Sequence, residues 1–378
     1  MHSPERKVLI ACCAPPAQTA ARLAEALQAP VDWRLLVDQN VAQGTLPLLS
    51  RALYRAGPTP VPPEFLAEIQ RKAAGKKLWS LGMAGELARV LRNFETAGLT
   101  AIAFKGPTLA YLAYGDIALR DFTDLDIYVP RQQLTAALNV LHSDGYHRKS
   151  AGFKTSLPGA CEVALRRQDP ECEIDLHWQF SPPYFLKFDA SRAIGRSVTV
   201  QASGLVARTL CSEDLLIYLC VHAARECWAI RSICDLAALL TNQSFDWDDL
   251  RREALRVGSW RAVAVGLRLA VSIFDAPVPP DIWSQVNRDQ SVCAIADQFA
   301  ENLSRDVTDY AGAPAGAMLH LRMMDSLASK ARYLWRRAFQ PNHLDADFIR
   351  LPDSLQPVYY LVRPLRVACT ALARLHQR

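Results

Sequence analysis

Two aspartates one residue apart, Asp124 and Asp126, are the side chains of this sequence best placed to do chemistry. They begin an alternating stretch, Asp124–Val129, and successive side chains of a strand point to opposite faces, so the two carboxylates share one face. Carboxylate oxygens on a rigid strand suit Mg²⁺, which also binds substrate phosphates. A third carboxylate, Asp175, lies in a second alternating stretch, Glu171–Gln179. On a neighbouring strand it would complete a two-metal site and serve to activate an acceptor.

A glycine turn precedes the aspartates. The apolar run at 99–104 predicts a strand, and Gly106-Pro107 follows it, with Pro107 suited to the first position of a helix. Gly106 lets backbone N–H groups approach a phosphate at a helix N-terminus, where the helix dipole favours an anion. Lys105 and Arg120 can add positive charge to the same phosphates.

Several other polar residues leave alternatives open. His177 shares a face with Asp175, where it either orients substrate and steadies a carboxylate or bonds to backbone at a strand edge. Glu173 is expected to be solvated. Four residues on two later helices have two alternative roles. They line a nucleotide or acceptor pocket, or an arginine and an aspartate among them form a buried pair that holds the helices together. These residues are His222, Arg225, Arg231 and Asp235.

Composition narrows the class of protein. The chain has 378 residues, half of them hydrophobic, and a net charge of +5, which fits an anionic small substrate but not a dedicated nucleic-acid surface. Its ten cysteines form no C-x-x-C pair, which argues against a zinc site and for a reducing cytoplasm. The first apolar run is too short for a signal peptide, and no segment approaches the roughly 20 apolar residues of a membrane span.

The periodicity predicts three parts. Residues 1–97 are expected to be helical, residues 98–210 to form a small mixed-sheet core, and residues 211–378 to be helical again. The core strands are expected at 99–104, 124–129, 146–149, 162–167 and 171–179, followed by a hairpin over 198–210. The basic stretches at 330–337 and 363–378 are expected to be solvated helix faces, with contact to a membrane surface or an acidic partner as the alternative.

Three segments together resemble a known family. FKGPTLAYLAYGD, LRDFTDLDIYVP and EIDLHW are similar to the DNA-polymerase-beta-like nucleotidyltransferase superfamily, and within it to a largely uncharacterised bacterial group. The resemblance extends to WRLLVDQNVAQGTLPLLSRAL before the core and to SEDLLIYLCVHAARECWAIRSICDLAALL after it. It implies an α+β fold, with Asp124 and Asp126 as the metal pair, Asp175 as the third carboxylate and Gly106 as the phosphate-loop glycine.

The chain departs from the superfamily at one point. The wider group has Gly-Gly or Gly-Ser in the turn, whereas this chain has Gly106-Pro107-Thr108. Proline has no N–H to donate, so one phosphate contact is lost unless the Thr108 hydroxyl replaces it. The predicted nucleotide-binding set is therefore Lys105, Gly106, Thr108, Arg120 and His177.

These residues predict an enzyme. The expected reaction transfers a nucleoside monophosphate from an NTP such as ATP to a hydroxyl or other nucleophile, with Mg²⁺ or Mn²⁺, and releases pyrophosphate. The acceptor is a small molecule, peptide or protein that the sequence does not name. The alternative is a catalytically weak nucleotide-binding protein, or an accessory protein of a peptide or sugar biosynthetic pathway.

Overall fold

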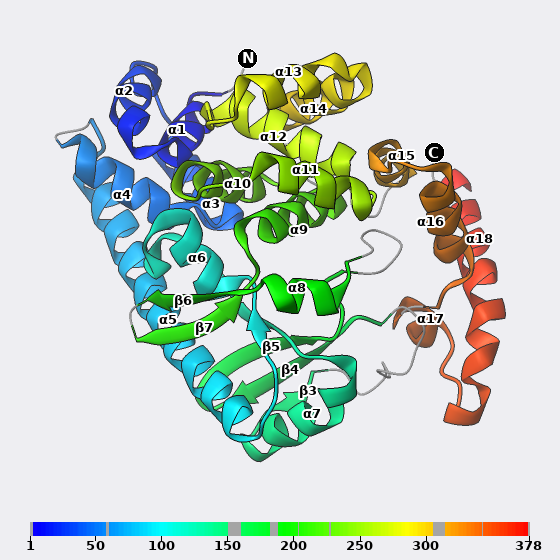
Figure 1. The fold of residues 1–378 in the computed structure, drawn as a ribbon. Coiled ribbons are helices and arrows are strands. Elements are labelled where there is room, and N and C mark those ends of the chain that lie inside the picture. Colours follow the sequence, from blue (N-terminus) through cyan, green and yellow to red (C-terminus); the bar gives the residue numbers. More distant parts are fainter. Residues whose placement is uncertain are drawn as a thin grey trace.

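The computed structural model describes residues 3–57, 60–149, 160–181, 188–202, 204–226, 228–304, 314–341 and 343–376. It has an α+β fold, as predicted: a small mixed sheet lies between helices that precede it and helices that follow it (Figure 1).

The N-terminal helices pack around a core of their own. They are α1 (Pro4–Cys13), α2 (Pro16–Ala26), α3 (Trp33–Gln43), α4 (Leu46–Ala56) and α5 (Pro63–Thr96). Asp32 caps α3, since its side chain accepts a hydrogen bond from Leu35 N at 3.0 Å. The 34-residue α5 extends beyond this core, and its second half packs against the sheet through Met83, Leu87 and Phe94.

The main sheet has the strand order β1-β2-β5-β4-β3. Its strands are β1 (Ile102–Ala103), β2 (Asp124–Tyr128), β3 (His147–Arg148), β4 (Glu162–Gln168) and β5 (Glu171–His177). Only β2 and β5 run parallel, and the other neighbours pair antiparallel. The expected strand at 99–104 shortens to two paired residues because the chain turns into a helix at Gly106.

The two faces of the sheet have different partners. Leu125, Ile127, Ile174 and Leu176 point to one face and are buried against α5 and α7 (Leu134–Ser143). The residues between them along each strand, which include all three predicted aspartates, point to the other face. The helical half of the chain lies over that face (Figure 1).

Shorter elements connect these layers. They are α6 (Gly106–Tyr114), η1 (Ile117–Leu119), η2 (Arg131–Gln133), α8 (Ala190–Arg196) and the hairpin of β6 (Val198–Ala202) with β7 (Leu205–Thr209). The hairpin was predicted and packs on β1 and α5, whereas α8 was not predicted.

The C-terminal half is helical, as predicted. A first group shares one core with α6: α9 (Ser212–Arg225), α10 (Ile230–Asn242), α11 (Trp247–Arg256), α12 (Trp260–Phe274), α13 (Pro280–Arg288) and α14 (Gln290–Ser304). The second group lies along one flank (Figure 1): α15 (Pro314–Met323), α16 (Leu327–Phe339), α17 (His343–Phe348), η3 (Asp353–Val358) and α18 (Tyr359–His376). Among the described residues no helix has both the length and the hydropathy to cross a bilayer.

Candidate active site

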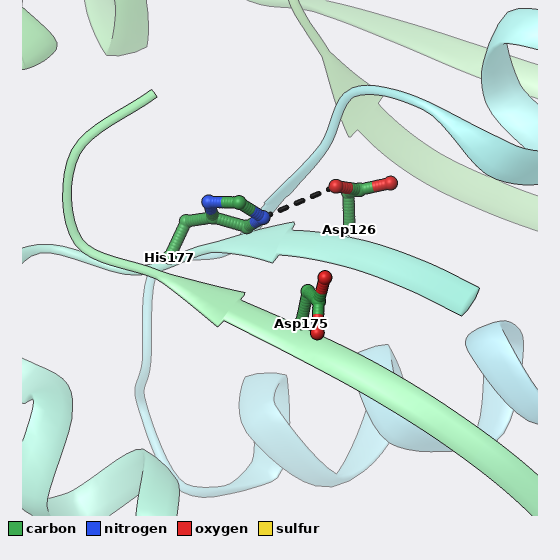
Figure 2. A group of neighbouring side chains, drawn as sticks. All are labelled: Asp126, Asp175 and His177. Carbon is green, nitrogen blue, oxygen red and sulfur yellow. Dashed lines mark hydrogen bonds and ion pairs between the residues drawn. The ribbon is translucent and has the colours of Figure 1, made fainter. Parts of the chain in front are cut away.

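Strand register brings two of the predicted aspartates together. Asp126 on β2 lies directly opposite Asp175 on the parallel strand β5. His177 follows two residues later on the same face of β5. One ligand atom from each of these three side chains lies within 4.8 Å of the others, so the group can hold a metal ion (Figure 2).

Asp126 is held by two cationic groups. Its Oδ1 atom lies 2.8 Å from Lys105 Nζ and 3.1 Å from His177 Nε2. Burial alone would raise the pKa of Asp126, but the charge of Lys105 and the hydrogen bond with His177 outweigh burial and hold the pKa well below its usual range. Asp126 is therefore an anion at neutral pH.

His177 bridges two carboxylates, so it steadies a carboxylate rather than bonding to backbone. Its second ring nitrogen, Nδ1, lies 3.1 Å from Glu162 Oε2 on β4, because Glu162 and His177 are cross-strand partners. Burial lowers the pKa of His177, but the contacts with Asp126 and Glu162 outweigh it and raise the pKa to about 9. The imidazole is thus a cation at neutral pH, and it would have to give up a proton to ligate a metal ion.

Glu162 is a site residue that the sequence did not reveal. Burial would raise its pKa, yet the contact with His177 lowers it to about 2. Its only sequence signal was a place at the start of a predicted strand. Its role depends on β4 pairing with β5, which alternation within one strand does not specify.

Within the described part of the chain, no cationic group forms an ion pair with Asp175 or Asp124. Burial raises the pKa of Asp175 to about 6, and the charge of His177 only partly opposes the neighbouring carboxylates. Burial and the nearby charge of Asp126 likewise raise the pKa of Asp124. Asp124 is not one of the three closely grouped ligands, so its role as a metal ligand stays a prediction.

These side chains line one cavity of about 210 Å³ between the sheet and the helical half. Its walls carry charges of both signs. The lining residues are Lys105, Arg120, Asp121, Phe122, Thr123, Asp124, Asp126, Glu162, Asp175, His177, Phe180, Tyr218, His222, Arg225, Glu226 and Arg231. His222, Arg225 and Arg231 therefore face the cavity, as one of the two alternatives foresaw.

The glycine turn lies behind the cavity wall. Gly106 has φ +54°, and a Cβ atom there would lie 3.4 Å from the Asp124 carbonyl oxygen, so glycine fits both the backbone and the approach to β2. Thr108 is fully buried, and its hydroxyl faces Ala103 O at 3.1 Å and Lys105 O at 2.9 Å. The prediction that this hydroxyl contacts a phosphate does not fit its position, because it is engaged within the turn.

An Arg–Asp pair does form with Asp235, but its arginine is Arg120 and not one of the arginines on the later helices. Asp235 on α10 accepts from Arg120 Nε at 2.9 Å and from the Tyr114 hydroxyl at 2.8 Å. The bond ties α10 to the segment between α6 and β2 and orients Arg120 on the cavity wall. Arg231 stays on the cavity side, where Gly44 leaves room for it: a Cβ atom at Gly44 would lie 3.1 Å from Arg231 Cδ.

Comparison with known proteins identifies the class. The profile of the family described as "Uncharacterised nucleotidyltransferase" matches residues 29–275, and the chain belongs to this family. The match spans α3 to α5 of the N-terminal helices, the sheet, and the later helices up to α12.

One solved structure among those similar to the chain is the crystal structure of an antigenic nucleotidyltransferase-like protein from Paracoccidioides brasiliensis. It has 15% sequence identity and a TM-score of 0.37, and the alignment covers 54% of this chain and 92% of that chain. No curated protein sequence matches.

Proposed function

We propose that this protein is a divalent-metal-dependent nucleotidyltransferase. It transfers a nucleoside monophosphate from an NTP to a hydroxyl or other nucleophile and releases pyrophosphate. The observation that carries the proposal is the direct register of Asp126 and Asp175 on parallel strands, with His177 beside them, on the floor of a charged cavity. Family membership supports the same reaction class.

The donor set fits Mg²⁺ or Mn²⁺. Asp126 and Asp175 offer carboxylate oxygens within reach of one ion, and Asp124 adds a third from the same cavity. Burial first, and then the charge of neighbouring carboxylates, raises the pKa of Asp175 and of Asp124, and a bound cation would offset both effects. When bound, the ion would lower the pKa of the attacking hydroxyl and neutralise charge on the phosphates.

Lys105 is the first residue proposed to hold the nucleotide. Its ammonium lies on the Asp126 carboxylate, and the nearby acidic charges outweigh the effect of burial and raise its pKa. It therefore remains charged at neutral pH. We propose that this ammonium leaves Asp126 when an NTP binds and contacts a phosphate oxygen instead.

The opposite wall supplies two further cations, Arg225 on α9 and Arg231 on α10. Arg225 has a distant ion pair, 4.0 Å from Glu226 Oε1. Arg231 makes no hydrogen bond or ion pair with any residue that the structure describes. Guanidinium groups bind phosphate oxygens in a bidentate manner, so these two side chains are the proposed triphosphate contacts.

Asp175 is the residue proposed to receive the acceptor's proton. Burial raises its pKa, which makes this carboxylate a stronger proton acceptor than an exposed one. It also lies directly across from Asp126, so the nucleophile and the phosphate would meet between the two strands.

The test is pyrophosphate release from a panel of NTPs with Mg²⁺ or Mn²⁺. Asp126→Asn keeps the shape of the side chain and should lower release by at least about a hundredfold, the usual effect of losing one strong electrostatic contact. Glu173→Gln is the matched control: Glu173 is on the same face of β5 but lies outside the cavity and pairs with Lys149. Thermal unfolding of each variant checks the fold.

The second candidate is a nucleotide-binding or accessory protein with little turnover. It is favoured by Pro107, which has no N–H at the start of α6, and by the engagement of Thr108 within the turn. Binding of an NTP without metal-dependent pyrophosphate release, unchanged by Asp126→Asn, would support this candidate and reject the enzyme.

A further inference from the structure

Exposed apolar side chains concentrate on the C-terminal flank. More than half of the large hydrophobic side chains that the structure describes as exposed belong to residues 318–367. Folded proteins rarely gather so many exposed apolar side chains in one segment unless something binds them. This flank is separate from the cavity described above, since none of the described residues beyond 231 lines that cavity.

The helix α16 turns an apolar stripe toward solvent. Leu327, Ala331, Leu334 and Trp335 are spaced i, i+4, i+7 and i+8, which places them on one face of a helix. The face is open: Leu327 is 83% exposed, Leu334 51% and Trp335 65%. The buried residue of α16, Tyr333, points the other way. An amphipathic helix therefore presents its apolar side outward.

Positive charge borders this stripe on both sides. At 100° per residue, Lys330 and Arg337 fall on one border and Arg332 on the other. The helix has no acidic residue, and none of these three cations forms an ion pair with a carboxylate of any described residue. Residues 327–376 contain eight Lys and Arg and three Asp. Their net charge of +5 equals that of the whole chain. The rest of the protein is therefore neutral on balance.

The helix α18 packs beside α16 (Figure 1). It also has no acidic residue, and Leu361 and Leu365, one turn apart, are 68% and 65% exposed. Its position is fixed by Asp345 of α17, which is fully buried and accepts from Arg366 Nε at 2.6 Å. The outward leucines are thus part of a packed arrangement.

We propose that α16, with α18 beside it, binds the surface of a bilayer that contains anionic phospholipids. Leu327, Leu334 and Trp335 enter the boundary between headgroups and acyl chains, where tryptophan is favoured. Lys330, Arg332 and Arg337 contact the headgroup phosphates. A second copy of the chain does not suit this face, because two such faces would bring cations against cations.

The test is cosedimentation of the purified full-length protein with two kinds of vesicle: phosphatidylcholine alone, and phosphatidylcholine mixed with phosphatidylglycerol. We expect binding to the mixed vesicles that weakens as salt is raised. Replacing Lys330, Arg332 and Arg337 by Gln should lower the partition coefficient about a hundredfold at low salt. Leu334→Ser with Trp335→Ser should lower it at least about tenfold.

Matched variants on α5 control for general charge and apolarity. Arg71, Lys77 and Arg92 are exposed cations of that helix, and their replacement by Gln changes the net charge equally. Leu78→Ser with Leu81→Ser removes two exposed leucines there. Equal loss from the α5 and α16 variants would overturn the assignment. Failure to bind mixed vesicles would overturn it too, and binding to polyglutamate in that case would favour an acidic protein partner instead.

Discussion

Two cationic groups contact the Asp126 carboxylate at a position that a bound metal ion would also use. Lys105 Nζ and His177 Nε2 both contact the same oxygen, Oδ1, at 2.8 and 3.1 Å. In the absence of nucleotide, an incoming divalent ion would compete with Lys105 for this carboxylate. Lys105 should therefore weaken metal binding to the free protein, although it is proposed to help bind the nucleotide.

Removing the competing charge tests this idea. Lys105→Met should tighten Mn²⁺ binding to the nucleotide-free protein by at least about tenfold, since one charge removed at this distance is worth more than 1 kcal/mol. The same variant should bind NTP more weakly. Electron paramagnetic resonance of free Mn²⁺ measures the first effect. Lys149→Met, which removes an exposed lysine from Glu173, is the control. Unchanged Mn²⁺ affinity in Lys105→Met would contradict the competition.

At the scale of elements, the sheet is joined to α5 by a charged cluster on the far side from the cavity. Glu86 of α5 lies 2.8 Å from Arg167 of β4 and accepts from the Tyr146 hydroxyl at 2.6 Å and from Arg89 at 2.7 Å. Burial would raise the pKa of Glu86, but these hydrogen bonds lower it to about 2. The cluster thus holds the helix on the sheet while Glu86 is ionised.

This pKa shift predicts a pH dependence of stability. Because the folded pKa of Glu86 lies below the unfolded value of 4.5, its contribution is complete above about pH 4.5 and is lost as the pH falls toward 2. Glu86→Gln should cost about 2 kcal/mol of unfolding free energy at neutral pH. The loss of unfolding free energy caused by Glu86→Gln should become smaller as the pH falls from about 4.5 toward 2. Urea unfolding at several pH values measures it, with the exposed Glu95→Gln of the same helix as control. A cost that does not vary with pH would show that the ionised form adds nothing.

Alternation within single strands was enough to predict which side chains of a strand share one face of the sheet. In β2 and in β5 every second side chain points toward the cavity, and these positions include Asp124, Asp126 and Asp175. Pairing between segments was not predictable in the same way. The contact of Glu162 with His177 needs the β4–β5 register, and the choice of Arg120 over Arg231 as partner of Asp235 needs the packing of α10 on α6. Neither leaves a local signal in the sequence.

At the scale of the whole molecule, the cavity is built by three parts of the chain. The sheet supplies the carboxylates, α9 and α10 supply Arg225 and Arg231, and Gly44 after α3 leaves the space that Arg231 occupies. One continuous apolar core also links the start of the sheet region with both helical regions, from Leu9 through Phe104 to Phe274. Ligand bound in the cavity should therefore stabilise the parts together.

The expected result is a single thermal transition that moves furthest when metal and nucleotide are both present. A ligand that binds the folded state alone contributes about 2.7 kcal/mol at a hundred times its Kd, which should raise Tm by at least about 3 °C for a protein of this size. Calorimetry with Mg²⁺, with a non-hydrolysable NTP and with both measures the shift. Asp126→Asn should abolish it, and Glu173→Gln should keep it. Two transitions, with only one displaced by the ligands, would show that the helical half unfolds independently and does not share the site.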